Sequence, residues 1–124
     1  MRVALLFAAA GLVAGPAPVT PAEAIKQVGR PAVVVEMTVK KAKDRVAKRG
    51  IVFLDSEDDF KHPDNLGVAV SAEAAAKYRA AGVTDLEAHF RGKRVRVRGC
   101  VMRFEERPYL PVHDPAQIAI VEAK

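Results

Sequence analysis

The chain has 124 residues, with 20 Lys and Arg against 15 Asp and Glu, and a formal net charge of +5. A chain of this length can bury one core of ordinary size but not two, so we expect a single domain. The single cysteine, Cys100, excludes an internal disulfide. We interpret it as a small strand residue, the alternative being an intermolecular bridge or a reactive thiol.

The first 24 residues have the features of a secretory signal peptide. Arg2 supplies a positive charge, Val3 to Ala14 is a short apolar run, and Ala22-Glu23-Ala24 fits a small-x-small cleavage site. An uncleaved membrane anchor is the alternative, but the run is short and prolines follow it. We therefore expect residues 1–24 to be removed, leaving one domain of residues 25–124 without a membrane span, in the periplasm or secreted.

Three strands are predicted in the first half of this domain. A short helical lead at Ala24 to Val28 precedes the first strand, in which four apolar side chains point to one side: Val33, Val35, Met37 and Val39. The following segments are a basic connector from Lys40 to Gly50, a second strand from Ile51 to Leu54, a polar loop from Asp55 to Asn65 and a third strand from Leu66 to Val70.

A helix is predicted after the third strand. Ser71 can cap it, Ala72 to Ala81 are mostly strong helix formers, and Gly82 is placed to end it. Thr84 and Glu87 match a capping box, which predicts a second helical turn that runs to Gly92.

Two further strands close the domain. Val95, Val97 and Gly99 alternate with Arg94, Arg96 and Arg98, which predicts a strand with one apolar face and one ladder of cations. The next strand follows Pro108 and Pro111 and ends at the turn signal His113-Asp114-Pro115, before a last apolar run from Ile118 to Val121. Three strands, a helix and two strands predict a mostly β domain with one helix, a five-stranded OB-fold Greek-key barrel.

Three segments carry a more specific resemblance: Phe53 to Glu57, with the sequence FLDSE; Gly92 to Val101, with the sequence GKRVRVRGCV; and Arg107-Pro108 followed by Asp114 to Ile118. With them the chain resembles small exported bacterial OB-fold domains related to the nucleic-acid-binding OB superfamily. The resemblance covers nearly the whole of residues 25–124. It implies a ligand face on the second and third strands, flanked by the loops after the first and fourth.

Basic and aromatic side chains are the candidates for this ligand face. Cations neutralise phosphates, and exposed aromatic rings stack on bases. The candidate binding residues are Lys40, Lys41, Arg49, Phe53, Arg94, Arg96, Arg98, Arg103, Phe104, Arg107 and Tyr109. The alternatives are a solvated basic surface for the cations and a place in the core for the rings.

Metal binding and catalysis find little support. The acidic loop from Asp55 to Asp64 is rich in oxygen ligands, which can hold a cation, but it lacks the spacing of an EF-hand. No nucleophile beside a base and no paired carboxylates at a recognisable spacing are present in the sequence. We expect no metal, no cofactor and no enzymatic activity.

Together these features predict an exported, monomeric binding module with a basic face. We expect it to bind single-stranded nucleic acid or another anionic polymer without catalysis. The alternative is a protein-interaction or scaffold module of the cell envelope, in which the charges serve solubility.

Overall fold

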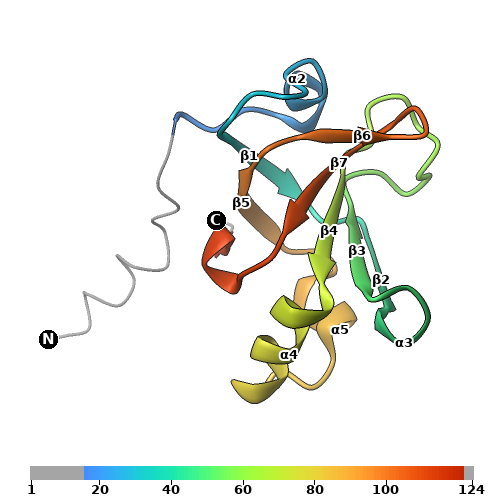
Figure 1. Cartoon of the computed structure of the whole chain (residues 1–124), viewed down its shortest axis with the longest axis vertical. Helices are drawn as coiled ribbons and strands as arrows, with labels where there is room; N and C mark the ends of the chain where they lie inside the picture. The colour runs from blue at the N-terminus through green and yellow to red at the C-terminus, as the bar shows by residue number, and fades with distance from the viewer. Residues whose placement is uncertain (1–15, 122–124) are drawn as a thin grey trace, which may run out of the picture.

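The computed structural model describes residues 16–121, and strands make up most of their regular structure (Figure 1). The first 15 residues of the predicted leader lie outside the described residues. The strands are β1 (Val33–Thr38), β2 (Lys41–Arg45), β3 (Ile51–Asp55), β4 (Gly67–Ser71), β5 (Arg94–Gly99), β6 (Met102–Phe104), β7 (Arg107–Val112) and β8 (Ile118–Val121). The helices are α2 (Pro21–Ile25), α3 (Val46–Arg49), α4 (Ala72–Ala80) and α5 (Leu86–Phe90), with a 3-10 turn, η1 (Pro115–Gln117). The prediction of a single helix was therefore wrong, because several short helices connect the strands.

The strands form two sheets, with the orders β1-β5-β8 and β2-β3-β4-β7-β6. Neighbouring strands are antiparallel except for β4 and β7, which are parallel. The chain passes directly from one sheet to the other at two bends, from β1 to β2 at Val39–Lys40 and from β5 to β6 at Cys100–Val101. It also passes between the sheets through α4 and α5, from β4 to β5, and through η1, from β7 to β8. If β1 with β2 and β5 with β6 are each taken as one bent strand, the pairings follow the Greek-key arrangement of an OB-fold.

The ladders are interrupted at these bends, which corrects the predicted single barrel. At the first bend, the Val39 amide donates to the Lys93 carbonyl at 2.9 Å, and the Lys40 amide donates to the Asp55 carbonyl at 2.9 Å. The chain thus exchanges one partner strand for another between two successive residues. Over the described range, the strands therefore form two sheets of three and five strands and no closed barrel.

The apolar faces of β1 and β5 point into the core, as the alternation of apolar and polar residues predicted for the first and fourth strands. Val35 pairs with Val97 and Met37 pairs with Val95, and all four side chains are buried. The predicted Ser71 cap is confirmed, since its hydroxyl accepts from the Ala74 amide at 3.1 Å. Helices α4 and α5 lie together at one end of the strands (Figure 1), where Leu86 and Phe90 close the core.

Several predicted boundaries move for identifiable physical reasons. The segment from Lys40 to Gly50 is not a connector but forms β2 and α3. The strand was not predicted because its alternating pattern contains only one buried apolar residue, Ala42. The second helical turn is capped by Asp85 rather than Thr84, since the Asp85 carboxylate accepts from the Ala88 amide at 3.0 Å. The helical lead is α2, five residues from Pro21 to Ile25, rather than Ala24 to Val28.

Strand β7 contains Pro108 and Pro111 instead of following them. Strand β6 pairs only with Arg107 to Tyr109, so Pro111 lies beyond the end of β6. On its other side, β7 pairs with β4 from Tyr109 onward, so Pro108 lies before that ladder begins. Proline is tolerated at such positions because a strand needs no donor there.

The segment before β1 belongs to the described fold. The Val19 amide donates to the Val34 carbonyl at 2.8 Å, and the Glu36 amide donates to the Val19 carbonyl at 2.9 Å. Ala24, at the predicted cleavage point, is fully buried in the core. In this structure Val19 and Ala24 therefore pack with the strands, although the sequence assigns residues 1–24 to the leader. No helix within residues 16–121 is long and apolar enough to cross a membrane.

Candidate functional site

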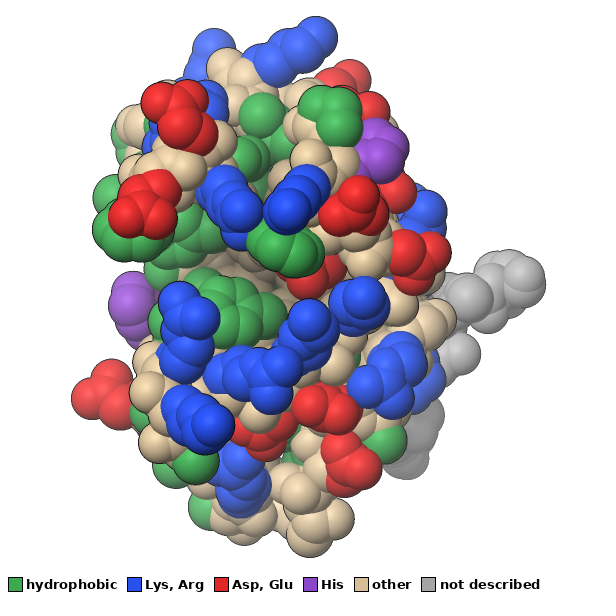
Figure 2. Space-filling model, turned by 90° about the vertical axis from the view of Figure 1, so that its right-hand side faces the viewer, with side chains coloured by type: hydrophobic (Ala, Val, Ile, Leu, Met, Phe, Trp, Pro, Cys, Tyr) green, Lys and Arg blue, Asp and Glu red, His purple; other side chains and the backbone are tan. Residues whose placement is uncertain are grey.

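A groove of about 1060 Å³ crosses the outer face of the five-stranded sheet. Its floor comes from β3, β4 and β7, one rim from β2 and α3, and the other rim from the β3–β4 loop and the β6–β7 hairpin. Figure 2 shows this face as a hollow that contains hydrophobic side chains and is bordered by Lys and Arg. The groove thus lies where the resemblance implied a ligand face.

The floor is open in its centre because the residues of β4 that face it, Gly67 and Ala69, are small. Phe53 pairs with Ala69, and Gly67 pairs with Tyr109, so the two rings stand on either side of β4. Gly67 and Ala69 present little side chain between them. A flat group of the size of a base can therefore reach the sheet next to an aromatic ring.

Four aromatic side chains line this one groove. Phe53 and Tyr109 are partly exposed on the floor, and Phe60 and Phe104 are 44% and 65% exposed on the rim. The Arg107 guanidinium lies 4.5 Å from the centre of the Phe60 ring, and the Arg49 guanidinium lies 5.9 Å from that of Phe53. These are cation–π contacts, and they hold cations beside the surfaces on which a base can stack.

Five cations line the groove, against three carboxylates. The cations are Lys43, Arg45, Arg49, Lys61 and Arg107, and the carboxylates are Asp55, Glu105 and Glu106. In the part of the chain that the structure describes, none of these five cations forms a salt bridge. Their charge therefore remains available to an anion.

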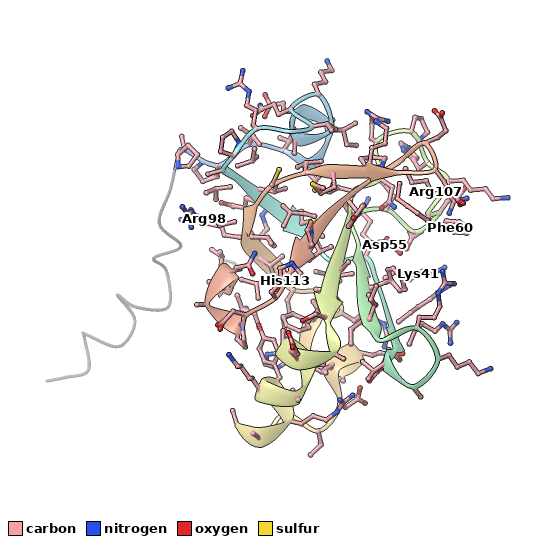
Figure 3. All side chains as sticks on the ribbon, in the orientation of Figure 1. Lys41, Asp55, Phe60, Arg98, Arg107 and His113 are labelled. Carbon is pink, nitrogen blue, oxygen red and sulfur yellow. The ribbon has the colours of Figure 1, made fainter. Side chains whose placement is uncertain are left out.

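The cations of β5 lie elsewhere. Arg94 and Arg96 bind the two carboxylate oxygens of Glu36 at 3.1 and 2.8 Å. The hydrogen bond from Arg96, helped by that from Arg94, lowers the pKa of Glu36 against the opposing effect of burial. Figure 3 shows Arg98 on the side of the molecule opposite to Lys41, Phe60 and Arg107. The predicted ladder of cations is therefore a surface separate from the groove, and two of its three arginines already form ion pairs.

The structure brings together five of the eleven candidate residues: Arg49, Phe53, Phe104, Arg107 and Tyr109. Lys41 shares the outer face of β2 with Lys43 but does not line the groove, and Lys40 forms an ion pair with Glu57 at 3.3 Å. Arg103, Arg94, Arg96 and Arg98 do not line it either. The groove residues that the prediction missed are Lys43, Arg45, Phe60 and Lys61.

The signal for two of the missed residues was present in the sequence. Lys43 and Arg45 alternate with Ala42 and Asp44, a period of two that marks a strand with one basic face. Phe60 and Lys61 carried no such signal. They lie in a loop, and only the folded chain brings that loop against the β6–β7 hairpin (Figure 1).

Asp55 lies at the floor of the groove as the only carboxylate there that is more than nine-tenths buried within the described residues. Burial raises the pKa of Asp55, and a hydrogen bond from the Asn65 amide opposes that rise. Asn65 Nδ2 donates to Asp55 Oδ1 at 3.3 Å. The floor thus combines apolar rings with one acidic group.

The acidic loop holds itself together through local hydrogen bonds. Asp59 accepts from the Lys61 amide at 2.9 Å, and His62 Nδ1 accepts from the Asp64 amide at 3.0 Å. Among residues 16–121, no group of three or more His, Cys, Asp or Glu side chains is arranged to hold a metal ion.

Comparison with known proteins supports the fold. The structure is similar to the crystal structure of the p204 HINb domain, with a TM-score of 0.50 and 17% sequence identity. The similarity covers 83% of this chain and 47% of that chain, so this chain spans about half the length of the structure it matches. No protein-family model and no curated protein sequence matches the chain. Together with the strand pairings, the similarity shows an OB-fold-like domain.

Proposed function

We propose that the groove binds single-stranded nucleic acid without catalysis. The observation that carries the proposal is the presence of four partly exposed aromatic rings and five unpaired cations in one groove of the described domain. Aromatic side chains stack on unpaired bases, and the cations neutralise the phosphates between them. A solvated basic surface needs no such rings, and a buried core needs no such cations.

The geometry favours an unpaired strand over a duplex. Phe53 and Tyr109 sit on the floor on either side of the small residues of β4. A ring in that position can be covered only by a base whose face is free, and bases inside a duplex have none. Arg2 and the apolar run from Val3 to Ala14 remain the reason to propose that the domain works outside the cytoplasm, on extracellular nucleic acid.

A protein-interaction module is the second candidate, and one observation favours it. Met102 and Phe104 are 42% and 65% exposed on β6, the edge strand of the five-stranded sheet. Exposed apolar residues on a sheet edge can also receive another chain.

The proposal is tested by fluorescence anisotropy of the purified protein with a labelled 12-residue oligothymidylate, across a salt series. A duplex of the same length and an uncharged oligosaccharide serve as competitors. We expect micromolar or tighter binding that weakens steeply with salt, and weaker binding of both competitors. Failure to bind the oligothymidylate, or binding that does not depend on salt, contradicts the proposal.

A matched pair of substitutions on β6 separates the two candidates. Phe104→Ala removes a ring that lines the groove, and Met102→Ala removes an exposed side chain from the same strand that does not line it. Loss of one stacked base costs about 1–3 kcal/mol, so Phe104→Ala should weaken binding about fivefold or more. Met102→Ala should leave it unchanged. Equal effects of both substitutions contradict stacking on Phe104.

A further inference from the structure

The carboxylate of Asp55 is buried at the groove floor with an unused acceptor. The residue is 8% exposed, and its Oδ1 accepts from Asn65 Nδ2 at 3.3 Å. Across residues 16–121, no hydrogen bond or salt bridge reaches its Oδ2. Lys41 and Lys43 favour its charge from a distance but do not pair with it. A buried carboxylate oxygen without a donor is costly, so Oδ2 is an acceptor that a ligand group can satisfy.

Asn65 fixes the chemical character of this floor. Its Oδ1 accepts from the Glu57 amide at 3.0 Å, and this backbone donor determines which way the side-chain amide is turned. Its Nδ2 donates to Asp55 and to the Phe60 carbonyl, at 3.3 and 3.4 Å, so both amide hydrogens are used. The floor therefore offers acceptors and no free donor from this pair. It suits a ligand group that presents N–H donors.

The register places this acceptor next to a stacking surface. Asp55 pairs with Gly67, and Gly67 pairs with Tyr109 on its other side. A Cβ atom on Gly67 would lie 3.3 Å from Asp55 Oδ1, so any larger residue there would crowd the carboxylate from the β4 side. Neighbouring strands are about 4.8 Å apart, so Asp55 and Tyr109 lie one strand away from Gly67 on either side, and a base above Gly67 can contact both.

We propose that Asp55 accepts hydrogen bonds from the edge of one base and selects guanine. This inference rests on the proposed function. Guanine presents two adjacent donors, N1–H and the N2 amino group, which match a carboxylate. Adenine and cytosine present one amino group beside a ring acceptor. Thymine presents one N–H between two carbonyl oxygens, which a carboxylate repels.

The test uses oligothymidylates of 12 residues in which one central position is dT, dG, dA or deoxyinosine. We expect dG to bind about fivefold tighter or more than dT, the range for a bidentate base contact. Deoxyinosine lacks the N2 amino group and should lose most of this gain. The dA oligonucleotide controls for purine stacking and should bind more weakly than dG.

The variant Asp55→Asn keeps the shape of the side chain but replaces an acceptor by an amide. It should lose the preference for dG over dT, which is measured as a ratio of affinities within the same protein. Acidic pH should reduce the preference of the wild type, because a protonated carboxyl has lost one acceptor. Thermal unfolding of both proteins confirms that they are folded.

The outcomes distinguish this inference from the proposed function. If no oligonucleotide binds, the proposed function fails and the inference fails with it. If the oligonucleotides bind but dG equals dT or dA, or if Asp55→Asn keeps the preference, guanine selection is overturned and the groove remains a strand-binding site. The comparison of dG with deoxyinosine needs no variant, so it decides the question even if Asp55→Asn does not fold.

Discussion

Removing two cations from the groove should change the salt dependence of binding by a calculable amount. Lys43→Gln with Arg107→Gln lowers the net charge from +5 to +3. Both residues line the groove, and neither forms a salt bridge in the described structure. On a single strand, each phosphate contact contributes about 0.7 to the slope of log K against log salt. If both residues contact phosphates, the slope should become shallower by about 1.4. Relative to the affinities at 1 M salt, the double variant should then bind about 25-fold more weakly than the wild type at 0.1 M salt.

The control for this prediction removes the same charge from another surface. Arg30 and Arg98 are exposed and do not line the groove, so Arg30→Gln with Arg98→Gln should leave the slope almost unchanged. Anisotropy titrations of both double variants at four salt concentrations measure the two slopes. An equal decrease in slope for the two variants would show that binding depends on net charge alone. That result would refute the proposal that the strand binds in the groove.

Three further predictions concern stability and are checked by chemical unfolding. A chain that begins at residue 25 should be less stable than one that begins at residue 16 by about 3 kcal/mol, because it lacks the two backbone hydrogen bonds of Val19 and the buried Ala24. Equal stabilities would contradict the packing of this segment against β1. Glu105 and Glu106 lie at the tip of the β6–β7 hairpin with φ values of +49° and +68°, which strain residues other than Asn and Gly. Replacing them by Asn and Gly should therefore stabilise the protein by about 1 kcal/mol or more. A loss of stability would show that the hairpin carries no such strain. Burial raises the pKa of Asp55, so folding disfavours its charged form and Asp55→Asn should stabilise the protein at pH 7. This gain in stability should be lost as the pH falls through the raised pKa of the folded protein towards 3.8, the value of a free Asp. A gain that does not change with pH would show that the charge of Asp55 is not its cause.

Alternation made most of the strands predictable from the sequence. Val33 to Val39 and Arg94 to Gly99 each present one apolar face, and the structure pairs them with those faces in the core. Strand β2 was missed because cations occupy its outward face and the inward one holds a single buried apolar residue, Ala42. A run of charges hides a strand when its apolar positions are too few to show a period.

The site was only partly predictable, because its composition depends on register and on loop contacts. Arg94 and Arg96 are strand residues on a polar face, and nothing in their own segment shows that Glu36 lies opposite and binds both. Phe60 and Arg107 are distant in sequence and meet at the groove rim. Aromatic residues in loops carry no periodicity, so the number of exposed rings in the groove could be found only from the fold.

The central claim is that the ligand lies in the groove of the five-stranded sheet. The most direct test is a two-dimensional NMR titration of the isotope-labelled protein with the 12-residue oligothymidylate, following the backbone amides. The account predicts shifts for amides of β3, β4 and the β6–β7 hairpin, with those of β1, β5 and β8 unchanged. Shifts concentrated on β1 and β5, around Arg94, Arg96 and Arg98, would contradict it and place the ligand on the opposite surface.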